Sequence, residues 1–223
     1  FVESDPGALA HCEKVLSAPD VTEAQFGLVA AALSRRGGRE AQAVLARVLA
    51  KQPKDHPGRH ALLVALGRSS EVSDETLALL RGLSDRPEAP DDRETALYML
   101  GAAAGEIEER APQRAAAVLD RLLEELVDAK RGSGAEALHE RVRLLRGLGN
   151  SGSSRPIDAV LVEADAADPD VRAAAIDALR FVTDARAVPR IHLAAKSDAT
   201  PSVRLTAIAT AALRPTSPEL VAL

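Results

Sequence analysis

Apolar residues recur three and four positions apart over most of this chain, which is the spacing that gives an α-helix one buried face. The clearest example is the range 112–128, whose apolar stripe lies opposite charged residues and consists of Val118, Leu119, Leu122, Leu123, Leu126 and Val127. Only the short run from Ile157 to Val162 resembles a β-strand, and Ala159 within it favours helix. The pattern therefore predicts an all-α chain.

Glycines, prolines and short polar side chains mark the expected helix ends. The predicted helices are 6–17, 21–35, 39–51, 57–67, 74–83, 92–104, 112–129, 134–148, 154–164, 169–182, 185–196, 201–213 and 216–222. Four pairs have the spacing of a capping box, namely Asp20 with Glu23, Asp91 with Glu94, Ser133 with Glu136 and Thr216 with Glu219. Left-handed positions after helices are expected at Gly37, Gly38, Gly67, Gly132 and Gly149. Helices joined by short turns indicate antiparallel hairpins.

The last third of the sequence contains an internal repeat. After 32 positions, Pro169, Val171, Arg172, Ala175 and Ile176 are matched by Pro201, Val203, Arg204, Ala207 and Ile208. A weaker copy lies 31 residues earlier and consists of Arg141, Leu144, Leu145 and Leu148. A two-helix unit of this size cannot bury its apolar stripe alone, so successive copies are expected to stack into a solenoid with a continuous core.

The repeat continues more loosely through the first half, where apolar blocks at 28–33, 61–66 and 96–100 return at intervals near 33 residues. We expect one α-solenoid domain over residues 1–223, with divergent repeats in 1–90 and clearer repeats in 91–223. The irregular connector 84–92 is a candidate for a bulge or for a boundary between two subdomains, although we favour a single body.

Two segments carry a family resemblance. The segments Asp168-Pro-Asp-Val-Arg-Ala-Ala-Ala-Ile-Asp-Ala-Leu and Thr200-Pro-Ser-Val-Arg-Leu-Thr-Ala-Ile resemble the second helices of HEAT repeats. The order Leu148-Gly-Asn-Ser-Gly152, Val171-Arg172 with Ala178-Leu179, Val203-Arg204 and Thr216-Ser-Pro218 is similar to the helical superhelix of vitellogenin and other large lipid transfer proteins. This finer likeness covers about residues 140–223. The resemblance implies a right-handed α-solenoid of HEAT-like antiparallel helix pairs.

For the family, this resemblance implies a helical arch that packs beside a lipid-carrying β-sheet cavity and also docks protein partners. This sequence has no amphipathic strands that could line such a cavity. A role in lipid transport would therefore belong to a longer parent chain. The first residue is Phe1 rather than Met, so we expect a fragment or a processed form, with any signal or anchor outside it and the compartment unknown.

Composition and charge exclude some partners. The net charge is −5, and the 28 basic residues are dispersed among 33 acidic ones, with only 2% aromatic residues, so nucleic-acid binding is not expected. No apolar run approaches the length of a membrane span. The single cysteine, Cys12, excludes an internal disulfide and a cysteine-based zinc finger.

The chemical motifs point away from catalysis and cofactors. Gly147-Leu-Gly-Asn-Ser-Gly152 matches the dinucleotide fingerprint, but it follows a helical stripe rather than the strand that this fingerprint requires. The histidines, His11, His56, His60, His139 and His192, fall in different predicted elements without metal-ligand spacing. The acidic cluster of Glu106, Glu108 and Glu109 is interpreted as a solvated helix end. We expect no cofactor, no metal and no enzyme activity.

The residues selected instead are structural repeat positions. Arg172 and Arg204 occupy matching places near helix starts, where each can reach a carboxylate such as Asp168, Asp170 or Asp198. Gly149, Asn150 and Gly152 are assigned to the turn between two repeats.

Three functions follow as expectations. The first is a non-enzymatic scaffold that binds another protein or another domain of its parent chain. The second is the superhelical module of a vitellogenin-like lipid transport protein, with lipid contacted through the parent chain. The third is a lyase-type enzyme of the kind that sometimes carries HEAT-like repeats.

Overall fold

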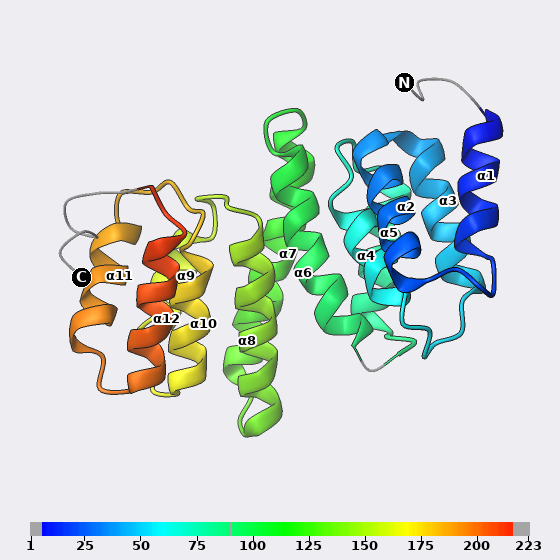
Figure 1. Ribbon diagram of the computed structural model, residues 1–223. Coiled ribbons are helices and arrows are strands. Elements are labelled where there is room, and N and C mark those ends of the chain that lie inside the picture. Colours follow the sequence, from blue (N-terminus) through cyan, green and yellow to red (C-terminus); the bar gives the residue numbers. More distant parts are fainter. Residues whose placement is uncertain (1–5, 90, 216–223) are drawn as a thin grey trace. The chain divides into compact units, whose positions relative to one another are not determined.

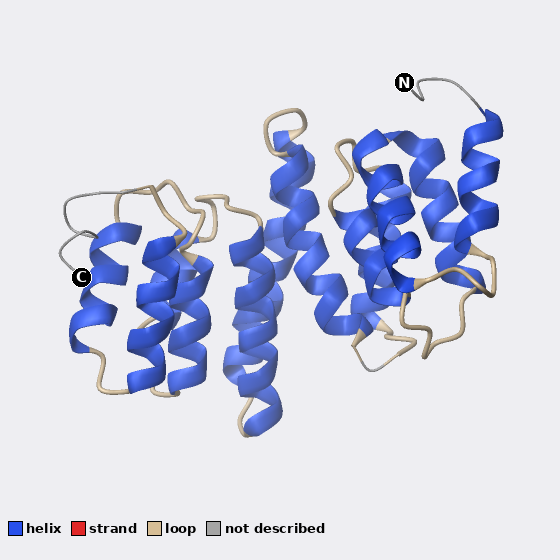
Figure 2. Cartoon of the chain, viewed as in Figure 1, coloured by secondary structure: helices blue, strands red, loops and turns tan. Residues whose placement is uncertain are grey.

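The computed structural model describes residues 6–89 and 91–215, and over these residues the chain forms twelve helices and no strand (Figures 1 and 2). The all-α prediction is therefore confirmed. The chain divides into two compact units, residues 1–111 and 112–223. The connector 84–92 lies inside the first unit, and the predicted single solenoid over 1–223 stays a prediction.

Unit 1 contains three successive pairs of helices. Their bounds are α1 (Pro6–Leu16), α2 (Glu23–Arg36), α3 (Gly38–Lys51), α4 (Arg59–Gly67), α5 (Asp74–Asp85) and α6 (Asp92–Ile107). The two helices of each pair follow each other along the chain and pack together: α1 with α2, α3 with α4, and α5 with α6. The second helices of these pairs also form a layer, because α4 packs against both α2 and α6.

Unit 2 repeats this arrangement with three further pairs. Its helices are α7 (Pro112–Arg131), α8 (Ala135–Asn150), α9 (Ile157–Glu163), α10 (Pro169–Ala178), α11 (Ala187–Ser197) and α12 (Pro201–Ala212). The second helices again form a layer, in which α10 packs between α8 and α12. Each of the twelve helices corresponds to a range predicted from the sequence, whereas the predicted helix 216–222 lies outside the described residues.

The first helices of unit 2 are linked at their solvent side by a repeated ion pair. Arg155, just before α9, contacts Asp120 of α7 at 2.7 Å, and Arg186, just before α11, contacts Asp158 of α9 at the same distance. These side chains are about half exposed or more, so each pair adds little stability and chiefly fixes the register of the repeats.

Each unit has its own core of Leu, Ile, Val and Ala. In unit 2, Leu144, Leu145 and Leu148 on α8 and Ile176 on α10 are fully buried, as the repeat pattern predicts. The stripe of 112–128 is buried at Val118, Leu119, Leu122 and Leu126, but Val127 is 49% exposed. The apolar face of this helix is therefore narrower than the sequence suggests.

Two of the glycines that we expected after helices lie inside them. Gly67 and Gly149 belong to α4 and α8, and neither has a positive φ, so the prediction of left-handed positions is wrong there. A Cβ on Gly149 would lie 2.3 Å from the Cα of Ala178, and a Cβ on Gly67 would lie 2.5 Å from the Cβ of Met99. Both glycines therefore permit the close approach of the next second helix. Gly37 and Gly38, at the α2–α3 junction, do have positive φ.

The helix caps also differ from the predicted pairs. Helix α2 starts at a capping box formed by Thr22 and Gln25, in place of Asp20 and Glu23. No side chain caps α6 at Asp91, and α8 begins after Gly134 rather than Ser133. Helix α10 is capped by Asp168, which accepts from the backbone N–H groups of the first turn. The remaining pair, Thr216 with Glu219, lies outside the described residues.

Candidate functional site

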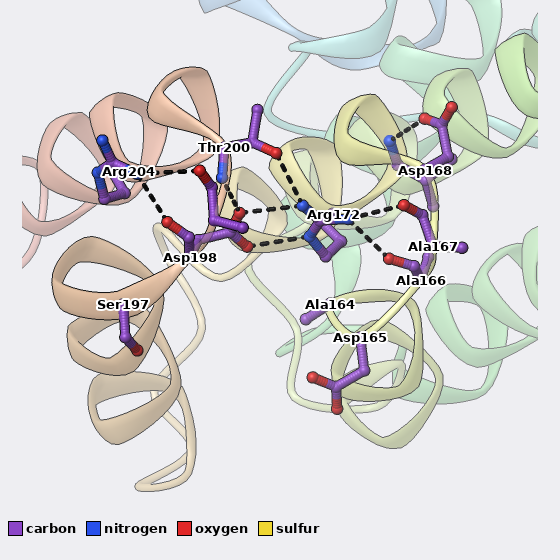
Figure 3. A network of polar contacts seen from close by, with 12 residues as sticks. Ala164, Asp165, Ala166, Ala167, Asp168, Arg172, Ser197, Asp198, Thr200 and Arg204 are labelled. Carbon is purple, nitrogen blue, oxygen red and sulfur yellow. Dashed lines mark hydrogen bonds and ion pairs between the residues drawn. The ribbon is translucent and has the colours of Figure 1, made fainter.

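Arg172 lies at the centre of a polar network in unit 2 (Figure 3). Its Nε and Nη2 donate to the two carboxylate oxygens of Asp198, each at 2.9 Å. Its Nη1 donates to the backbone carbonyls of Ala166 and Ala167 at 3.0 and 2.9 Å. Arg172 of α10 therefore binds the connector before its own helix and the connector that starts the next second helix.

Arg204 repeats one half of this geometry. Its Nη1 donates to the carbonyls of Asp198 and Ala199 at 2.8 and 3.2 Å, which lie six and five residues earlier, as Ala166 and Ala167 do for Arg172. Among the described residues Arg204 has no carboxylate in the place that Asp198 takes beside Arg172. The two arginines that match in the sequence therefore also share their contacts with backbone carbonyls.

The charges of this network stabilise each other. The guanidinium of Arg172 lowers the pKa of Asp198 below its ordinary value, and Asp198 in turn raises the pKa of Arg172. Of the other two carboxylates considered from the sequence, Asp168 caps α10 and Asp170 is exposed in its first turn. This network links helices and connectors, and it is a structural element.

The other repeat positions lie around the end of α8. Gly149 and Asn150 are its last residues, the Oδ1 of Asn150 accepts a bond from Arg180 at 3.4 Å, and Gly152 has a φ of 67° in the turn that follows. Gly147 and Gly149 of the G-x-G-x-x-G match are therefore helical, and the strand that a dinucleotide site requires does not precede them.

The histidines that have described contacts make structural ones. The ring of His56 lies 5.6 Å from that of Phe26, and its Nδ1 accepts from the N–H of Gly58 at 3.0 Å. The Nδ1 of His60 lies 3.3 Å from Thr95 Oγ1. Over the residues that the structure describes, no three His, Cys, Asp or Glu side chains are grouped as metal ligands would be.

Beside these histidines, the starts of α4 and α6 are joined by a buried ion pair. Arg59 donates from Nε and Nη2 to the two oxygens of Asp92 at 2.8 Å each, and both side chains are almost fully buried. Asp92 also accepts from the backbone N–H groups of Glu88 and Ala89, which ties these two residues to the start of α6. A cavity of about 280 Å³ lies above this pair. Because the charges of Arg59 and Asp92 are paired with each other, we assign this ion pair to the architecture of unit 1.

A larger cavity, of about 480 Å³, lies along the layer of second helices in unit 1. We call it the α2–α4–α6 groove, since these three helices supply its lining. Its small apolar residues are Gly27, Ala31, Ala61, Val64 and Ala65, and its polar residues are Ser34, Arg35, His60, Arg68 and Glu106. The small side chains leave room for a docked segment along the groove, where larger ones would fill it.

Three charged residues stand at one end of the α2–α4–α6 groove. Arg35 is in the last turn of α2, Arg68 follows α4 directly, and Glu106 is in the last turn of α6. All three are exposed, and within the described part of the chain the side chains of Arg35 and Arg68 have no hydrogen-bond or ion-pair partner. A basic group at a helix C-terminus is favoured by the helix dipole, which explains the position of Arg35 but leaves its charge available.

The sequence alone does not predict this groove. Its lining comes from three helices that do not follow each other in the sequence, so it exists only once α2, α4 and α6 are stacked. One signal was present, because Arg35 and Arg68 are 33 residues apart and thus obey the repeat interval of the first half.

No protein-family model matches this chain, and no curated protein matches its sequence. None of the described helices combines the length and the apolar character that crossing a membrane requires.

Proposed function

We propose that this chain is a non-enzymatic scaffold of HEAT-like repeats, a right-handed α-solenoid, whose α2–α4–α6 groove binds an acidic segment of another protein or of a neighbouring domain of its parent chain. The paired helices and the continuous layers of second helices in each unit support the repeat architecture. The 32-residue repeat of sequence and of arginine contacts supports it further.

The observation that carries the binding function is a pair of arginines that have no side-chain partner among the described residues and stand beside the small apolar residues of one groove. Most arginines with described contacts bind a carboxylate or a backbone carbonyl, whereas Arg35 and Arg68 face solvent at the same end of one groove. Carboxylates of a docked segment would meet both guanidinium groups, for which bidentate pairing is the favoured geometry.

The other residues of the groove define the rest of the ligand. Ala31, Ala61 and Val64 offer a shallow apolar surface, which suits the small side chains of a helical or extended segment. Glu106 adds one negative charge on the α6 side, so a basic residue of the ligand fits there. The ligand is therefore amphipathic, with carboxylates toward α2 and α4.

The experiment is an anisotropy titration with a fluorescein-labelled helical peptide of Ala, Leu and Glu as the probe. The comparison peptide carries Lys in place of each Glu. We expect the Glu peptide to bind and the double variant Arg35→Glu/Arg68→Glu to weaken it by about tenfold or more, because two favourable charge contacts become repulsive.

The matched control is Arg81→Glu/Arg86→Glu. These two arginines of unit 1 also have no side-chain partner among the described residues, but they lie outside the groove lining. The control changes the net charge equally and should leave the affinity within about twofold. Equal weakening by both double variants, or equal binding of the Lys peptide, would show that the groove is not the binding site.

A further inference from the structure

Helix α12 is the last described helix in the layer of second helices of unit 2. Helix α10 packs between α8 and α12, whereas α12 packs against α10 and α11, and no described helix covers its opposite face. Since the two helices match in sequence at an offset of 32 residues, each position of α12 can be compared with its partner in α10.

The comparison reveals an exposed apolar stripe on α12. Its members have the i, i+3, i+4, i+7 spacing of one helix face and are all exposed: Leu205, Ile208, Ala209 and Ala212. Leu205 and Ile208 are 67% and 48% exposed. The matching residues in α10 and just after it are buried or half-buried: Ala173, Ile176, Asp177 and Arg180. The same face that is covered in α10 is thus open in α12.

Arg204 gives a second, independent observation at this face. Arg172 binds backbone carbonyls just before its own helix, such as that of Ala166. It also binds the carboxylate of Asp198, which lies just before α12, the helix that covers α10 (Figure 3). Arg204 binds the equivalent carbonyls, but its guanidinium has no carboxylate among the described residues. The open stripe and an arginine that has no carboxylate partner among the described residues therefore lie on the same helix, α12. For α10, the helical hairpin that follows it supplies both the apolar cover and the carboxylate.

We infer that α12 is a docking face for another helical hairpin that carries a carboxylate directly before its second helix. The helix of this partner covers Leu205 and Ile208, and its carboxylate binds Arg204, as α12 and Asp198 do for α10. This interaction is separate from the groove of unit 1. A second copy docked through the same face does not supply the charge, because α12 contains no acidic residue.

The test uses the full chain, extended after Leu223 by a second copy of residues 192–215, which continues the 32-residue register. The readout is amide hydrogen exchange over α12, compared with the chain that lacks the extension. We expect exchange in α12 to slow by about tenfold, since a covered helix opens less often than an end helix. Exchange in α10 should stay unchanged, which shows that the rest of unit 2 is intact.

Two variants separate specific docking from nonspecific contact. Asp198→Asn in the added copy keeps an acceptor for the N–H of Thr200 but removes the charge, and it should lose most of the slowing. Ile208→Asp in the original chain should abolish the slowing. Unchanged exchange on extension, or slowing that survives both variants, would overturn the inference. A dimer of the unextended chain that Ile208→Asp dissociates would also overturn it, because the occupant would then be a second copy.

Discussion

The guanidinium of Arg172 binds both carboxylate oxygens of Asp198 at 2.9 Å, and this bond joins α10 to the connector that starts α12. The two side chains are 15% and 9% exposed, so the pair is largely shielded from solvent. Its place between successive second helices makes it a link between neighbouring repeats.

This link predicts coupled effects on stability. Arg172→Ala and Asp198→Ala should each destabilise the chain, and the double variant should cost less than the sum of the two. A coupling energy of about 1–3 kcal/mol is expected for a shielded bidentate pair in contact. Urea unfolding of the four proteins measures it, and strictly additive effects would show that the contact contributes no specific energy.

Glu13 is expected to make the free energy of unfolding depend on pH. Arg47 and Lys51 of α3 lie 2.7 and 3.2 Å from its carboxylate and lower its pKa from 4.5 to about 2. Because the pKa is lowered in the folded state, the stabilisation is complete above pH 4.5 and disappears as the pH falls toward 2. The two bases are more than half exposed, so solvent screening limits the effect to about 1 kcal/mol or less.

The measurement is the melting temperature of the parent chain and of Glu13→Gln between pH 6 and pH 2. The difference in melting temperature between the two proteins should be largest at pH 6 and vanish at pH 2. A difference that does not change with pH would contradict the ion-pair assignment.

Gly149 should not tolerate a methyl group. In Gly149→Ala the new Cβ would overlap the backbone of Ala178, so α8 and α10 must separate, at a cost of about 2–3 kcal/mol. Gly82→Ala is the matched control, because Gly82 of α5 has no atom near its Cβ position and helix propensity there favours Ala by about 0.5–1 kcal/mol. Chemical denaturation should thus show opposite signs for the two variants, and a stable Gly149→Ala would refute the close contact.

An apolar substitution at Thr210 should increase the stability of the chain. Its side chain on α12 is 1% exposed, and its Oγ1 has no hydrogen-bond partner among the described residues. Thr210→Val keeps the shape and removes the buried hydroxyl, which should stabilise the chain by about 1 kcal/mol. Thermal unfolding checks this, and a lower melting temperature would mean that the hydroxyl is satisfied.

The sequence predicts the helices well because each has a local signature. The stripe of 112–128 and the matched segments at Pro169 and Pro201 identify helices from their own residues, and local periodicity is independent of the rest of the fold. The caps are predicted less well, since Thr22 and Asp20 are both suitable N-caps and the backbone selects between them.

Tertiary relationships explain what the sequence could not predict. Gly149 has the spacing of a helix end, and only the approach of Ala178 shows that the glycine serves packing. Arg35 and Arg68 look like solvated residues until the stacking of α2 and α4 places them at one groove. Repeat periodicity places the helices in register, but cavities arise only from the side chains that stacking brings together.

The most direct test of the binding function is a charge swap at the α2–α4–α6 groove. The double variant Arg35→Glu/Arg68→Glu is titrated with both labelled peptides, one containing Glu and the other Lys, after circular dichroism has verified its helix content. The proposed site predicts a reversal, in which the parent chain prefers the Glu peptide and the variant prefers the Lys peptide. If the variant and the parent chain show the same preference, the acidic segment does not bind at Arg35 and Arg68.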